Sequence, residues 1–245
     1  MEVYAAMVHR LDQNIGKILH FLQVAGRLES TLIIVTSDNG GSAELVVDKS
    51  TGREIGAEHE IGSVGRWASL GSAWAEVSNT PFRYYKNYSH NGGVVAPFIV
   101  HWPAGIERKG AIIRTPAHLI DIHPTLLGVA RRFKGNTASE LSPSLPGRDL
   151  SRYFDSNALV SRDGLLFNHW RDGRYVVSDR WKLVSYGRLK NGQMPPWELY
   201  DVEEDPVELL DLADERPKIV MELEAAYLAW EDGHIRLLRG IGVEP

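Results

Sequence analysis

Cysteine is absent from the 245 residues of this sequence. Its absence excludes disulfide bonds, thiolate metal ligands and a cysteine nucleophile within the chain. An excess of positive charge is also missing: the net charge of -5 at pH 7 provides no basic field for nucleic acid or an anionic membrane surface. No apolar run approaches the roughly 20 residues that a transmembrane helix needs. We therefore expect a globular chain with neither nucleic acid nor a membrane among its partners.

A secretory signal is missing from the N-terminus as well. Residues 1–22 mix acidic and basic side chains into an apolar helical period, whereas a signal peptide has a basic start followed by an apolar stretch. We expect no cleaved leader. The compartment stays undetermined. It is the cytoplasm if Met1 is the true start, and the periplasm is the alternative if the chain belongs to a longer parent protein.

The first half of the sequence indicates an α/β fold. Apolar side chains recur at intervals of three and four over residues 4–22, which predicts an amphipathic helix. The apolar run 32–36 follows, and it predicts a strand buried on both faces, as in a parallel sheet. A second buried strand is predicted within residues 94–102. A helix is predicted within residues 115–130, with Pro124 near its start, where its missing amide does least harm.

The pattern changes in the second half, where short apolar runs between residues 165 and 202 predict hairpin-linked strands. The turn signals are Asp172-Gly173, Asp179-Arg180 and Asn191-Gly192. Residues 217–238 then have the period of one amphipathic helix. We therefore predict two domains, an α/β part over residues 1–150 and a small antiparallel sheet with one helix over residues 151–245.

Polar residues and two glycines end the first predicted strand, in the order Ser37-Asp38-Asn39-Gly40-Gly41. In open α/β sheets ligands bind outside the carboxyl ends of strands, and Asp and Asn oxygens are hard donors that suit Ca²⁺ or Mg²⁺. Glycines allow the backbone to approach a ligand closely. Asp-Asn-Gly is also common turn chemistry. From these residues alone a turn is the simpler interpretation, and a metal site stays open.

Other polar residues are ambiguous when they are considered singly. Lys86 lies among aromatic residues and could bind an anion as a point charge, although a solvated surface lysine is the simpler interpretation. His90 could titrate or bind a metal, or only orient its loop. Asp121 and His123 have the wrong spacing for one helix face, which favours a structural role. Ser144 begins a Ser-x-Pro-x-Arg pattern within a polar connection, and we interpret this as coincidence.

Taken together, these segments resemble the type I sulfatases, which are arylsulfatases of the alkaline-phosphatase-like superfamily. Residues 4–19 resemble the helix before the family's second metal-binding strand, and residues 31–40 resemble that strand. Residues 79–105 are similar to the sulfate-lysine segment, with His-Asn-Gly-Gly where the family usually has His-Glu-Gly-Gly. Residues 118–130 and 198–213 are similar to two C-terminal signatures. The resemblance covers nearly the whole chain in family order.

The resemblance implies an alkaline-phosphatase-like mixed α/β sheet with flanking helices, present in part, followed by a small C-terminal antiparallel α+β subdomain. It implies that Asp38 and Asn39 are two ligands of a divalent cation, Ca²⁺ or Mg²⁺, and that Lys86 contacts the sulfate of the substrate. The family's early Asp-Asp pair and its formylglycine nucleophile, made from Cys or Ser, match nothing here and are expected upstream of Met1. We therefore expect a chain that keeps two metal ligands and one sulfate contact and lacks the nucleophile.

The expected activity is hydrolysis of a sulfuric ester, either a small sulfate ester or a sugar sulfate, with the chain inactive by itself. One alternative is a non-catalytic remnant or partner subunit, which would complete a site with an N-terminal sulfatase half or a second copy. Another is part of a phosphonate monoester hydrolase or phosphodiesterase of the same superfamily, because these enzymes use a similar metal cradle.

Overall fold

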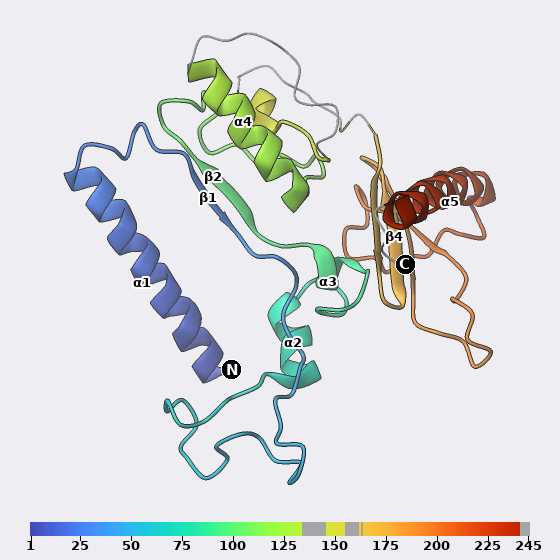
Figure 1. Cartoon of the computed structure of the whole chain (residues 1–245), viewed down its shortest axis with the longest axis horizontal. Coiled ribbons are helices and arrows are strands. Elements are labelled where there is room, and N and C mark those ends of the chain that lie inside the picture. The colour runs from blue at the N-terminus through green and yellow to red at the C-terminus, as the bar shows by residue number, and fades with distance from the viewer. Residues whose placement is uncertain (134–145, 155–161, 163, 241–245) are drawn as a thin grey trace. The chain divides into compact units, whose positions relative to one another are not determined.

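A computed structural model describes residues 1–133, 146–154, 162 and 164–240 (Figure 1). The chain divides into two compact units, Met1–Ala104 and Gly105–Pro245. The predicted domain boundary at residue 150 stays a prediction, because a compact unit of the structure need not coincide with a domain defined by sequence. Within the described residues, no helix combines the length and apolar character that a membrane crossing requires.

The first unit contains a two-stranded ladder with three helices. The elements are α1 (Glu2–Val24), β1 (Ile33–Thr36), α2 (Gly71–Asn79), α3 (Asn91–Val94) and β2 (Phe98–His101). Strands β1 and β2 pair antiparallel, with Ile33 opposite His101 and Thr36 opposite Phe98. The prediction of a parallel pairing is therefore wrong for this pair.

Burial of the two strands also differs from the prediction. Ile33, Ile34 and Val35 of β1 are half-buried, and three of the four residues of β2 are exposed. Because β1 and β2 form a sheet of two strands in the described residues, each strand has one unpaired edge and incompletely covered faces. The second strand is also shorter than predicted, since residues 91–94 form the short helix α3.

The N-terminal helix α1 forms where the apolar period predicts it, yet none of its residues is buried. Met7 is 66% exposed and Phe21 is 71% exposed. The other exposed apolar side chains of the helix are Tyr4, Val8, Leu11, Ile18 and Val24. The helix therefore presents an apolar face that no described residue covers.

The second unit begins with a short 3₁₀ turn, η1 (Leu119–Asp121), and the helix α4 (Ile122–Phe133). Pro124 is the third residue of α4, as predicted, where an amide would have no partner within the helix. A second 3₁₀ turn, η2 (Leu150–Phe154), follows and packs against α4.

An antiparallel sheet and a long helix complete this unit. The strands β3 (Leu166–Trp170), β4 (Gly173–Val177), β5 (Trp181–Tyr186) and β6 (Glu198–Asp201) are hydrogen-bonded in sequence order. Helix α5 (Pro217–Gly240) packs on β4 and β5 (Figure 1). The predicted hairpins and single helix are therefore confirmed. Their core contains Val176, Leu183 and Leu199 from the strands, Trp197 before β6, and Leu223 and Tyr227 from the helix.

Candidate functional site

The candidate site begins at the carboxyl end of β1. Asp38 and Asn39 follow the strand by two and three residues, and Asp38 is exposed whereas Asn39 is half-buried. The Ser37 hydroxyl donates to the carbonyl oxygen of Asn39 at 3.1 Å, which shapes the backbone turn. The turn thus places two hard oxygen donors beyond the strand end, and neither side chain is buried.

The glycine after this pair is required by a close backbone contact. The Gly40 amide donates to the carbonyl oxygen of Gly93 at 3.0 Å. A Cβ atom at position 40 would lie 1.8 Å from the carbonyl oxygen of Gly92, which is impossible without moving the backbone. Gly40 therefore allows the strand end to dock directly on residues 92–93.

Asn79 at the end of α2 holds three segments together, and its role could not be found from the sequence. Its Oδ1 accepts from the Gly41 amide at 2.9 Å, and its Nδ2 donates to the carbonyls of Tyr84 at 2.9 Å and Gly92 at 2.8 Å. The first contact joins residues 38 positions apart. No local pattern marks such a pairing, because Asn is equally common in turns.

Lys86 lies against the segment that follows the Asp-Asn pair. Its amide donates to the Gly41 carbonyl oxygen at 3.0 Å. Its ammonium group forms an ion pair with Glu44, with an Nζ–Oε2 distance of 3.0 Å, and the Ser42 hydroxyl donates to the same carboxylate oxygen at 2.8 Å. The lysine and glutamate side chains are 34% and 54% exposed, so solvent screens this pair and leaves it exchangeable. The structure thus brings Lys86 beside the strand end with an acidic partner that sequence reasoning did not assign to it.

An aromatic cluster supports the loop around Lys86. The rings of Tyr84 and Tyr88 are stacked at 4.3 Å, and the His90 ring meets Tyr84 edge-on at 4.9 Å. His90 is 3% exposed, consistent with a residue that orients its loop. Tyr84 and Asn87 have φ angles of 65° and 82°, which non-glycine residues rarely adopt. The two unusual backbone conformations bracket Lys86 and fix the course of the chain on both sides of it.

The donors at the strand end fit a divalent cation by type but do not complete its shell. A carboxylate and a carboxamide are the ligands that Ca²⁺ and Mg²⁺ prefer, and Ca²⁺ takes six to eight oxygens. Among the residues that the structure describes, no group of three or more His, Asp or Glu side chains is placed to hold a metal. Within this part of the chain, Asp38 and Asn39 therefore supply at most a partial coordination sphere.

The long loop after β1 offers further carboxylates, and the structure gives Asp48 and Glu58 other partners. One Asp48 oxygen accepts from Ser50 and Thr51, and these hydrogen bonds, led by that from the Ser50 hydroxyl, lower the pKa of Asp48. Glu58 lies 3.5 Å from the His59 ring. Neither forms a metal cluster with Asp38 in the described residues.

The remaining candidates from the sequence lie in the second unit or outside the described residues. Asp121 is fully buried and forms an ion pair with Arg162, in agreement with a structural role. His123 is an exposed residue of the first turn of α4. Ser144 lies outside the described residues, so its interpretation as a coincidental motif stays a prediction.

Solved structures share the fold of this chain. A crystal structure of Ps i-CgsB in complex with k-i-k-neocarrahexaose matches with a TM-score of 0.65 and 22% identity, over 93% of this chain and 42% of that one. The crystal structure of yidJ from Bacteroides fragilis matches with a TM-score of 0.55 and 18% identity, over 94% of this chain and 41% of the other. The expected alkaline-phosphatase-like fold is thereby confirmed.

Curated relatives give the family. An uncharacterised sulfatase of Schizosaccharomyces pombe is 28% identical over 253 residues, which cover 94% of this chain and 43% of the relative. The arylsulfatase of Klebsiella aerogenes is 33% identical over 132 residues, which cover 51% of this chain and 28% of that enzyme. The chain thus spans less than half of the length of these relatives. The sequence profile of the sulfatase family matches residues 1–131, more than half of the chain, and the chain therefore belongs to the sulfatase family.

Proposed function

We propose that this chain supplies two cation ligands and one sulfate contact to the active site of a sulfuric ester hydrolase. The observation that carries the proposal is the hydrogen bond from the Lys86 amide to the Gly41 carbonyl oxygen. It links the lysine segment to the end of β1, three residues after Asp38. Family membership supports the reaction class, and the spacing of these residues supports their joint use.

Each residue has a separate task in this proposal. Asp38 and Asn39 would hold Ca²⁺ or Mg²⁺ through their side-chain oxygens. The cation would supply positive charge close to the sulfuryl oxygens of the ester. Lys86 binds one of those oxygens through its ammonium group. Glu44 pairs with that ammonium when no substrate is bound, and the sulfate displaces it because both are anions that compete for the same cation.

A partner chain or further segment is part of the proposal. The apolar face of α1 is uncovered, and the ladder of β1 and β2 has open edges in the described residues. An N-terminal sulfatase segment, which would carry the formylglycine and the Asp-Asp pair of the family, is the proposed occupant. The same uncovered features suit the second candidate function, that of a non-catalytic partner subunit. Association with such a segment that produces no turnover would favour this second function.

The experiment measures hydrolysis of 4-nitrophenyl sulfate in the presence of Ca²⁺. Purified chain is assayed alone and mixed with a separately expressed sulfatase segment that carries the formylglycine and the Asp-Asp pair. We expect no turnover by the chain alone, because an activated nucleophile and a proton donor are both needed. We expect turnover on mixing, and a loss of about 100-fold with Lys86→Ala, since transition-state contacts of this kind typically have that effect.

Lys49→Ala is the matched control, because Lys49 is exposed in a turn of the same unit and should leave the rate unchanged. Turnover by the chain alone that survives Lys86→Ala would contradict the assignment of this residue. Loss of that turnover with Ser144→Ala would identify the serine as the nucleophile instead. Association on mixing without turnover would favour the non-catalytic subunit.

A further inference from the structure

The second unit contains a cavity of about 360 Å³ with two arginines in its wall. Arg148 and Arg162 provide the charged part of the lining, and Phe167 and Trp230 contribute aromatic surface. The volume falls in the range of about 300–1,000 Å³ that is usual for small-molecule sites. The accessible lining of this cavity is mainly polar, which suits a polar or charged ligand group.

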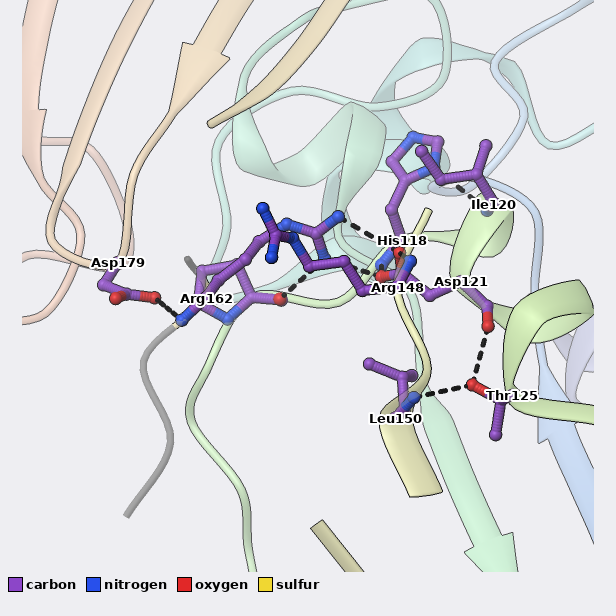
Figure 2. A network of polar contacts seen from close by, with 9 residues as sticks. His118, Ile120, Asp121, Thr125, Arg148, Leu150, Arg162 and Asp179 are labelled. Carbon is purple, nitrogen blue, oxygen red and sulfur yellow. Dashed lines mark hydrogen bonds and ion pairs between the residues drawn. The ribbon is translucent and has the colours of Figure 1, made fainter. Parts of the chain in front are cut away.

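The carboxylate of Asp121 is fully used by its present partners (Figure 2). Oδ1 accepts from the Arg148 amide at 2.8 Å and from Nη2 of Arg162 at 3.1 Å. Oδ2 accepts from the His118 amide at 2.8 Å and from Nη1 of Arg162 at 2.6 Å. A carboxylate offers about four lone-pair positions, so Asp121 neutralises Arg162 and has no position left for the Arg148 guanidinium.

The charge of Arg148 is therefore uncompensated among the residues that the structure describes. Its guanidinium makes no hydrogen bond or ion pair there, and Nη2 lies 2.7 Å from the place of a Cβ atom on Gly164. The nearby carboxylate of Asp149 instead accepts from the Ser151 amide at 2.8 Å. A free guanidinium in a cavity wall has five donors in a fixed fork that matches a tetrahedral or planar oxyanion.

Arg162 lines the same cavity but offers it no free donor. Its Nη groups donate to Asp121, its side chain is 4% exposed, and its Nε, which has no hydrogen-bond partner in the described residues, is buried out of reach of solvent. Asp179, another acidic residue next to Arg162 among those the structure describes, is exposed and accepts from the backbone amide of Arg162 at 2.7 Å. It does not compensate the guanidinium of Arg148.

We propose that this cavity binds an oxyanionic group of the sulfate type, with the Arg148 guanidinium as its contact and the side chains of Phe167 and Trp230 against the apolar or ring part of the ligand. These three residues lie in the second unit, whereas Lys86 lies in the first. The inference is argued from the second unit alone and does not depend on the proposed hydrolysis.

Isothermal titration calorimetry tests this site in the full chain carrying Lys86→Ala, so that the other sulfate contact does not contribute heat. The probes are phenyl sulfate, inorganic sulfate and phenol. We expect both oxyanions to bind and phenol not to bind. Tighter binding of phenyl sulfate would identify a sulfate ester as the natural source, and equal binding would identify the free anion.

Arg148→Gln, added to this background, should raise the Kd of phenyl sulfate about tenfold, because it removes charge-assisted hydrogen bonds. Arg148→Lys should retain part of the affinity, since it keeps the charge and loses the fork. Arg239→Gln, at an exposed position in the last turn of α5, changes the net charge equally and should have no effect. An unchanged Kd with Arg148→Gln, an equal loss with Arg239→Gln, or no binding of either oxyanion at millimolar concentration would overturn the proposal.

Discussion

Replacement of Lys182 by Met should strongly destabilise the C-terminal sheet. Lys182 on β5 forms an ion pair with Glu208 at 2.7 Å, and the side chains are 1% and 0% exposed. The lysine ammonium also lies 5.5 Å from the centre of the Tyr175 ring. Burial lowers the pKa of Lys182, and the Glu208 carboxylate acts against this by stabilising the charged form.

The magnitude follows from the burial of both partners. Lys182→Met leaves the Glu208 carboxylate buried without this cation, and breaking a buried ion pair in this way typically costs about 3–5 kcal/mol. This is a large fraction of the roughly 5–15 kcal/mol that stabilises an ordinary folded protein. Replacing both residues, with Lys182→Met and Glu208→Gln together, should recover most of the loss, since no charge is then left in the interior.

Native-state hydrogen exchange at the Leu183 amide measures the opening free energy of β5 directly. Arg188→Gln is the control, because it breaks an exposed ion pair with Asp172 of the same 2.7 Å length, in which both side chains are 50% exposed. Solvent screening should keep the cost of this change below about 1 kcal/mol. A single Lys182→Met cost no larger than that of the control, or a double variant no better than the single one, would refute the reasoning.

Two further predictions concern acid stability and metal binding. Burial lowers the pKa of His118, whose Nδ1 accepts from the Ile120 amide at 3.2 Å. As the pH falls, His118 therefore binds a proton more readily in the unfolded chain than in the folded one. The unfolding free energy should for this reason fall as the pH drops below about 6.5. His118→Asn, which keeps a capping acceptor that does not titrate, should reduce this fall in urea unfolding at pH 7.5 and 5.5, and an identical pH dependence would contradict the assignment. Calorimetry with Ca²⁺ should show a Kd of about 100 μM or weaker, or no binding, because Asp38 and Asn39 are too few ligands, whereas sub-micromolar binding would reveal ligands that we have not identified.

The sequence by itself determined the elements whose signals are local. The apolar period of residues 4–22 predicted α1, and the alternation of short runs with turn residues predicted β3 to β6 and the helix that follows. Side-chain period and turn chemistry act over a few residues, so they can be recognised without knowing what the element packs against. The position of Asp38 and Asn39 at a strand end was determined in the same way.

Tertiary structure decided the pairing and burial of those elements. The run 32–36 was predicted as a buried parallel strand, but its partner lies some 65 residues later and runs antiparallel, because the direction of pairing depends on the path of the chain between them. The contact of Asn79 with Gly41 depends likewise on the docking of α2 and could not be deduced from composition.

The same distinction applies to the charged groups. Lys86 was recognised through family resemblance, but its ion pair with Glu44 spans 42 positions. Asp121 and Arg162 are 41 positions apart, and no local pattern joins them. A local pattern states which residue types are present, whereas the free energy of a charge depends on which groups the folded backbone places within a few ångströms of it. For this reason the sequence predicted the chemistry of the strand end, and only the folded chain showed that Arg148 has no acidic partner among the described residues.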